Sequence, residues 1–226
     1  MISHQGIAAA SDNDDLIVDE RLAALSPSLS TDFIHDVVSA AYDPYVNSLS
    51  GFQPANGKGT VLQIYATEFL RGRLCAMGWE MCDRYEVPCI VDREHSIRLC
   101  CSTDGGASVG REGSIPALRT KGLGTLRLAG CERNMTLPIP ELVYLAPEAR
   151  LTRIDSFRFY YLLMHIDEPK NEIRMEVSCP VFCEQGSLNK WADRIILPPL
   201  SLTHEPLVRT PEVPKPEIPV KKRKTS

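Results

Sequence analysis

The first part of the chain spaces its apolar residues as amphipathic helices do. Apolar positions recur every three or four residues, which predicts three helices, over residues 14–25, 32–42 and 61–87. Thr31 is placed to cap the second helix, and Thr60 with Gln63 forms a capping box for the third. Pro88 is expected to end the third helix, because a proline disfavours helical geometry in the residue before it.

After the third helix the pattern changes to that of β-strands. Residues 88–92 and 96–102 flank a short polar turn and predict a hairpin, and residues 142–147 predict a further short strand. Residues 157–166 are apolar on both faces, which predicts a central strand that is covered on both sides. Residues 173–181 alternate apolar and polar side chains, so one face of this strand is expected to meet water. The polar side chains of that face are Arg174, Glu176 and Ser178.

Together these elements predict a single α+β domain. We expect the N-terminal helices to pack against a mainly antiparallel sheet built from residues 88 to about 198. The domain is assigned to residues 14–200, helical over 14–87 and strand-rich over 88–200. Residues 1–13 are small, polar and acidic, so we expect them to be disordered. Residues 116–132 fit a glycine-weakened helix and a strand equally well, and both alternatives stay open.

The composition is that of a globular protein. Apolar residues make up 43% of the 226 residues, which is enough to build a core. No apolar run approaches the roughly 20 residues that cross a bilayer, and the N-terminus lacks the basic start and long apolar region of a signal peptide. We therefore expect the chain to act in the cytoplasm, or in the nucleus if the host is eukaryotic, without membrane contact.

The chain contains eight cysteines, yet their spacing does not suggest a disulfide framework. They stand at positions 75, 82, 89, 100, 101, 131, 179 and 183. Cys75 and Cys82 fall on the predicted third helix about two turns apart, roughly 10 Å, which is too far for a disulfide. We expect most of the thiols to be reduced and buried, and no cofactor. The alternative is a tetrahedral metal site formed by His95, Cys100, Cys179 and Cys183.

Two glycine-containing segments raise the question of phosphate binding. Residues 97–113, "IRLCCSTDGGASVGREG", lack the glycine-lysine-hydroxyl ending of a P-loop, because Arg111 and Glu112 follow Gly110. Residues 57–60, "GKGT", place a glycine where the P-loop hydroxyl is needed. The first segment is therefore interpreted as a strand that runs into a flexible turn.

A metal-dependent nuclease is the enzymatic alternative. Nucleases of the restriction-enzyme type gather two acids and a nearby lysine on adjacent strands, where the acids hold magnesium. Asp92 can supply the first acid, and Glu172 with Arg174 gives the best later match. Arginine is a poor substitute for the lysine because it keeps its charge. The simpler interpretation places Asp92 and Glu172, like Asp167, in turns that face water.

The positive charge of the chain gathers in two places, although the overall net charge is −4. The first is a stretch that contains Arg111, Arg119, Lys121, Arg127 and Arg133. The second is the C-terminal tail, residues 201–226, whose last 18 residues carry six bases and two acids. Prolines at 211, 214, 216 and 219 keep this tail out of regular structure, and it ends in the basic run Lys221, Lys222, Arg223 and Lys224.

These features favour a non-enzymatic function. We expect a small intracellular binding or adaptor protein that contacts nucleic acid or an acidic protein through the basic tail, with the 111–133 stretch as a second contact. The metal-dependent nuclease or related hydrolase remains the alternative, and it requires the carboxylates of Asp92 and Glu172 to lie within about 4–6 Å of a common point.

Overall fold

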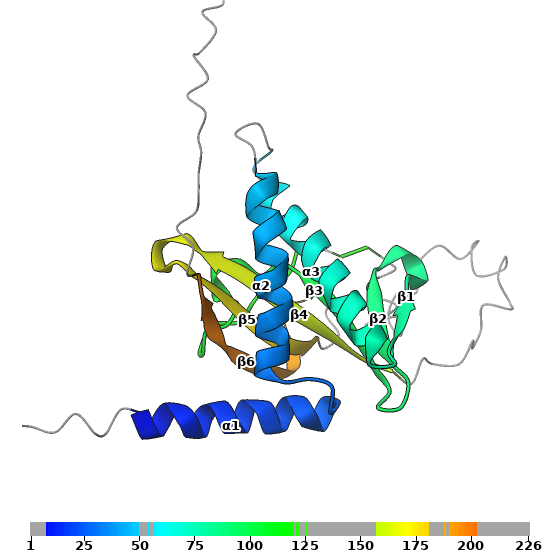
Figure 1. The fold of residues 1–226 in the computed structure, drawn as a ribbon, viewed down its shortest axis with the longest axis horizontal. Helices are drawn as coiled ribbons and strands as arrows, with labels where there is room; N and C mark the ends of the chain where they lie inside the picture. Colours follow the sequence, from blue (N-terminus) through cyan, green and yellow to red (C-terminus); the bar gives the residue numbers. More distant parts are fainter. Residues whose placement is uncertain are drawn as a thin grey trace, which may run out of the picture.

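Three helices precede six strands in the part of the chain that the computed structural model describes (Figure 1). The described residues are 8–49, 54, 57–119, 121–122, 125, 157–180, 188 and 190–202. The helices are α1 (Ala8–Leu25), α2 (Thr31–Ser48) and α3 (Gly57–Ala76). The strands are β1 (Glu80–Cys82), β2 (Cys89–Asp92), β3 (Ile97–Ser102), β4 (Arg158–Asp167), β5 (Glu172–Pro180) and β6 (Trp191–Ser201). The predicted α+β class is confirmed.

The six strands form one sheet in the order β1-β2-β3-β4-β5-β6. Every neighbouring pair is antiparallel except β3 and β4, which run parallel with Ile97 opposite Arg158 and Ser102 opposite Leu163. The hairpin β2–β3 and the central position of β4 are as predicted from the apolar pattern. The sheet is therefore mainly antiparallel, with one parallel pair at its centre.

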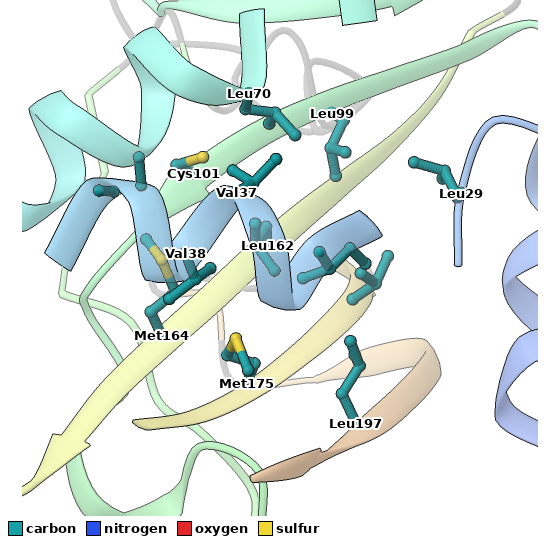
Figure 2. Packing of buried hydrophobic residues seen from close by; sticks show 14 of the residues in the cluster. Leu29, Val37, Val38, Leu70, Leu99, Cys101, Leu162, Met164, Met175 and Leu197 are labelled. Atoms are coloured by element: carbon teal, nitrogen blue, oxygen red, sulfur yellow. The ribbon is translucent and has the colours of Figure 1, made fainter. Parts of the chain in front are cut away.

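Helices α2 and α3 lie side by side across one face of the sheet (Figure 1). Their buried side chains recur at helical spacing, so they form a stripe that faces the strands. Figure 2 shows this stripe meeting the central strands, with Val37, Val38, Leu70, Leu162 and Met164 among the packed residues. The main core of the domain therefore lies between the helices and the sheet.

The opposite face of the sheet is covered by the segment that follows β3, residues 103–119, which is called the covering segment below. A second apolar cluster joins Phe159, Tyr161 and Leu163 of β4 to Val109 and Leu118 of that segment. Because this segment covers β5 as well, the expectation of a half-exposed strand is wrong. Three side chains expected to meet water are buried, and they are Arg174, Glu176 and Ser178.

Helix α3 is shorter than predicted. It ends at Ala76, and Gly78 adopts a left-handed conformation with φ of 94°. The amide of Gly78 donates to the carbonyl of Cys75, and the amide of Trp79 donates to that of Leu74. This pattern is the Schellman motif, which ends a helix at a glycine. The residues after it form β1, so the sheet begins before Pro88, and Cys82 lies on a strand.

The other helix boundaries also differ from the prediction. Ser30, not Thr31, caps α2, because its hydroxyl accepts a hydrogen bond from the amide of Phe33. Helix α3 begins at Gly57, three residues before the predicted cap Thr60. Helix α1 begins at Ala8, inside the range predicted to be disordered.

Some apolar residues of the first and third predicted amphipathic helices are exposed. Leu16 and Ile17 of α1 are 63% and 47% exposed, although Leu22 and Leu25 of the same helix are buried. Met77 and Met81 are also exposed, because the chain leaves the helix before them. No helix among the described residues is both long and apolar enough to span a bilayer.

Several predicted features lie outside the described residues. They are the strand at 142–147, most of the undecided segment 116–132, Cys131, Cys183, Arg127, Arg133, residues 1–7 and the tail after Leu202. Within the undecided segment, Leu118 forms an isolated bridge with Leu188.

Candidate functional site

The two acids of the nuclease alternative lie at opposite ends of the sheet. Asp92 pairs with Ile97, which lies opposite Arg158 at the start of β4. Glu172 pairs with Asp167 at the end of the same strand. Nine residue steps along β4 correspond to about 30 Å at roughly 3.3 Å per residue. Asp92 and Glu172 therefore cannot hold one metal ion between them.

Asp92 serves the structure of its own turn. The hydroxyl of Ser26 donates to Oδ2 at 2.7 Å, the backbone amide of His95 donates to Oδ1 at 3.1 Å, and the ring Nδ1 of His95 lies 2.8 Å from Oδ2. Burial by itself would raise the pKa of Asp92, but these hydrogen bonds hold that pKa below its usual value. The side chain is buried, so the expectation that it faces water is wrong.

Asp167 and Arg174 form a buried ion pair beneath the segment after β3. Asp167 is 8% exposed, so the expectation that its side chain faces water is wrong. Its Oδ2 lies 3.4 Å from Nε of Arg174. The Nη1 of Arg174 donates to the carbonyls of Ala107 at 2.8 Å and Val109 at 2.9 Å. Arg174 therefore fastens the covering segment to the sheet. Glu172, the acid next to it on the strand, pairs with Lys170 at 3.7 Å.

Glu176 is the centre of a second buried network, which the sequence did not suggest. Its carboxylate accepts hydrogen bonds from the amide of Gly110 at 3.0 Å, the hydroxyl of Ser178 at 2.9 Å and Nε of Arg194 at 3.2 Å. The guanidinium of Arg194 also donates to the carbonyl of Ser114 at 2.7 Å. These contacts hold the covering segment against β5 and β6.

The predicted metal ligands are not brought together. Cys100 belongs to the apolar cluster on the covered face, whereas Cys179 packs against the cluster beneath the helices. His95 lies in the β2–β3 turn with its ring on Asp92. Cys183, the remaining member, lies outside the described residues. Within the described part of the chain, no group of three His, Cys, Asp or Glu side chains is placed to hold a metal ion.

We predict that the purified protein contains less than one equivalent of zinc and that Cys100 and Cys101 resist a water-soluble thiol reagent until the chain unfolds. Burial raises the pKa of both thiols to about 12, so the reactive thiolate is scarce at neutral pH. Metal analysis and mass-spectrometric mapping of labelled cysteines, with and without urea, test this. The partly exposed Cys75 and Cys82 are the internal controls and should react first. One equivalent of zinc, or rapid native labelling of Cys100 or Cys101, would contradict the prediction.

The described members of the basic stretch all have acidic partners. Arg111 lies 3.3 Å from Asp167, and Arg119 lies 3.6 Å from Asp104. The ammonium of Lys121 also pairs with Asp104. Asp104 is shared by Arg119 and Lys121, and Asp167 is shared by Arg111 and Arg174, so two carboxylates balance only part of this charge. Because each of these bases is already held in an ion pair, it is less available for contact with a partner.

A cavity of about 190 Å³ opens at the end of the parallel pair β3–β4. Its walls come from the last turn of α2, the first turn of α3, Thr103 just after β3, and the end of β4 with the turn that follows. Crevices outside the carboxyl ends of parallel strands are common ligand sites in α/β sheets. The sequence drew attention to Lys58 and Gly59 in this wall, but it gave no signal that Tyr45, Thr103 or Glu168 would join them.

Comparison with known proteins provides no template for the function. No protein-family model, curated protein or solved structure matches the chain. Its function is therefore inferred from contacts, burial and charge.

Proposed function

We propose that this protein is a non-enzymatic binding protein that acts inside the cell and contacts an acidic partner, nucleic acid above all, through its basic tail. The basic tail is defined here as residues 209–226. The observation that carries the proposal is the contrast between the two basic regions. Arg111, Arg119 and Lys121 are paired with carboxylates of the domain. The tail has two acids for six bases, so it cannot neutralise its own charge.

The placement of the acids argues against the hydrolase alternative. Asp92 and Glu172 are separated by the length of β4, and each is already bound to side chains of its own turn or strand. A binding function needs no such cluster. It needs accessible charge, and a basic, proline-spaced segment supplies that without a core of its own.

Deletion of residues 210–226 is expected to abolish salt-sensitive binding to DNA and to leave the thermal midpoint unchanged. The deletion removes five of the six bases of the basic tail. If about four bases contact phosphates, affinity for duplex DNA should fall roughly 100-fold between 50 and 200 mM salt in the full chain. Fluorescence anisotropy with a labelled random-sequence duplex measures this.

The matched control keeps the length of the tail and removes its charge. In this variant Lys221, Lys222, Arg223 and Lys224 are all changed to glutamine, and it should bind as weakly as the deletion. Competition with polyglutamate distinguishes a preference for nucleic acid from binding to any acidic polymer. If the tail prefers nucleic acid, polyglutamate should displace the duplex poorly. A truncated chain that binds DNA as tightly as the full chain would show that the tail is not the contact. A lower thermal midpoint of the truncated chain would show that the folded domain extends beyond Leu202.

A further inference from the structure

Three cysteines stand side by side across the first three strands of the sheet. Cys82 of β1 lies directly opposite Cys89 of β2 in the antiparallel register. The register of β2 and β3 places Ile90 opposite Leu99, so one further residue brings Cys100 opposite Cys89 on its other side. Such cross-strand neighbours point to the same face of a sheet. Cys89 and Cys100 belong to the apolar cluster beneath the covering segment, and Cys82 packs against it.

Cys82 and Cys89 lie within reach of a disulfide bond. Opposed residues of antiparallel strands have Cα atoms about 4.5–5.5 Å apart, and disulfides span Cα distances of about 4.4–6.8 Å. A hydrogen bond already links the two side chains. The Cβ atoms of such neighbours must approach by up to about 1 Å to form the bond. β1 is a three-residue strand at the edge of the sheet (Figure 1), so it has room to make this movement.

Arg71 of α3 fixes the two backbones at this position. Its Nη2 donates to the carbonyl of Cys82 at 3.3 Å and to that of Cys89 at 3.0 Å. The same nitrogen lies 2.5 Å from Oδ1 of Asp83, the residue after Cys82. One guanidinium therefore holds the start of the β1–β2 turn and both cysteines against the helix, which keeps the two thiols in register.

The three thiols differ in their access to solvent. Cys82 is partly exposed, whereas Cys89 is 1% exposed and Cys100 is 4% exposed. Burial is the main cause that raises the pKa of Cys89, and it raises the pKa of Cys100 to about 12. Neither buried thiol forms a thiolate readily at neutral pH. An oxidant from the solvent therefore meets Cys82 first, and the thiol beside it is that of Cys89.

We propose that Cys82 and Cys89 form a redox site, in which hydroperoxides convert the two thiols to a disulfide and dithiol compounds convert it back. Cys82 is the cysteine that is oxidised, and Cys89 is the cysteine that resolves the product. An accessible cysteine beside a resolving cysteine is the arrangement typical of redox-sensitive sites. This site is separate from the basic tail, so the proposal goes beyond the proposed function.

The reaction takes two steps. In the first, the sulfur of Cys82 attacks one oxygen of the hydroperoxide and the O–O bond breaks. The leaving alkoxide or hydroxide takes up the thiol proton, and Cys82 becomes a sulfenic acid. In the second, the sulfur of Cys89 attacks that of Cys82, the S–O bond breaks, and hydroxide leaves with the Cys89 proton as water. The two sulfurs lose two electrons in total, and the peroxide gains them.

The remaining described cysteines face the other side of the sheet. Cys101 belongs to the cluster beneath the helices, and Cys75 and Cys179 pack against that cluster. Cys75 is partly exposed like Cys82 and lies only seven residues before it. It is therefore the matched control for a cysteine of similar access and similar sequence position that has no place in the row.

Peptide mapping of the full chain without reduction tests the proposal. Reduced protein is treated with hydrogen peroxide, the remaining thiols are alkylated, and trypsin cleaves after Arg84, which separates Cys82 in peptide 74–84 from Cys89 in peptide 85–93. The two peptides should appear joined, with the loss of two hydrogen atoms, and dithiothreitol should release them. Absence of the joined peptides would overturn the proposal, and so would a predominant bond between Cys89 and Cys100.

Two serine variants assign the oxidised cysteine. Cys82→Ser should abolish the joined peptides and leave Cys89 reduced, because the remaining thiols of the row are buried. Cys75→Ser should form the disulfide as wild type does. Survival of the joined peptides in Cys82→Ser, or their loss in Cys75→Ser, would overturn the assignment of Cys82.

A third variant tests the role of Cys89. Cys89→Ala should stop the reaction at the sulfenic acid, so dimedone, which labels sulfenic acids, should mark Cys82 several-fold more than in wild type. Equal labelling of Cys82 in the two proteins would show that Cys89 does not resolve the sulfenic acid. These measurements involve no nucleic acid, so the redox site and the proposed function of the tail stand or fail separately.

Discussion

Replacing Tyr161 by alanine is expected to lower the free energy of unfolding by about 3–5 kcal/mol, the range for truncation of a large buried aromatic side chain. Tyr161 lies in the middle of β4 and is 3% exposed. Its ring meets that of Phe159 edge to face with centroids 4.8 Å apart, and the ammonium of Lys121 lies 6.0 Å from its centroid. Alanine would leave a cavity between the sheet and the segment that covers it.

Urea denaturation of wild type and variant measures this loss. Ile64→Ala is the control, because Ile64 is 57% exposed on α3 and alanine suits a helix, so its effect should stay within about 0.5 kcal/mol. If Tyr161→Ala unfolded at the same urea concentration as wild type, the covered face of the sheet would contribute little to stability.

The second large effect is expected for Glu176→Ala, which should cost about 3–5 kcal/mol. Glu176 is fully buried. Its carboxylate accepts hydrogen bonds from the amide of Gly110, the hydroxyl of Ser178 and the guanidinium of Arg194. Alanine would leave the amide of Gly110 without its acceptor and the charge of Arg194 without its partner. Thermal and urea unfolding measure the loss.

A double variant tests whether the loss of stability in Glu176→Ala comes from the unpaired charge or from the lost side-chain volume. Glu176→Leu combined with Arg194→Met replaces the pair by apolar groups of similar size, and it should be more stable than Glu176→Ala, because it leaves no charge without its partner. Glu176→Gln keeps the shape and should fall between wild type and Glu176→Ala. A double variant less stable than Glu176→Ala would show that the network contributes more than the pairing of charges.

The apolar pattern predicted the elements whose structure depends on local sequence. Residues 157–166 are apolar on both faces, and β4 is indeed central and covered on both sides. The pattern failed at β5, because an alternating polar face is normally taken to meet water. Here the polar face meets partners from distant parts of the chain, Gly110 before it and Arg194 after it. A single sequence does not reveal such pairings.

The cavity was beyond sequence reasoning for the same physical reason. Tyr45, Lys58, Thr103 and Glu168 come from four separate segments, and only the fold brings them to one place. The sequence argument against a P-loop around Lys58 rests on the glycine that stands in place of the hydroxyl. Thr103 lies 43 residues after Thr60, the last residue of this motif. The sequence could not indicate that Thr103 would lie against the first turn of α3.

The parallel pairing of β3 with β4 has a consequence for how the domain folds. In every other pair of neighbouring strands, at most ten residues separate the two strands in the sequence, whereas Ile97 pairs with Arg158, 61 positions later. Closing so long a loop costs chain entropy before its contacts repay it, and such non-local contacts slow folding. The helices with β1–β3 form one locally connected piece, and β4–β6 form another. The two pieces meet at this pair of strands and where α1 and α2 contact β6. We therefore expect these non-local contacts to limit the folding rate of the domain.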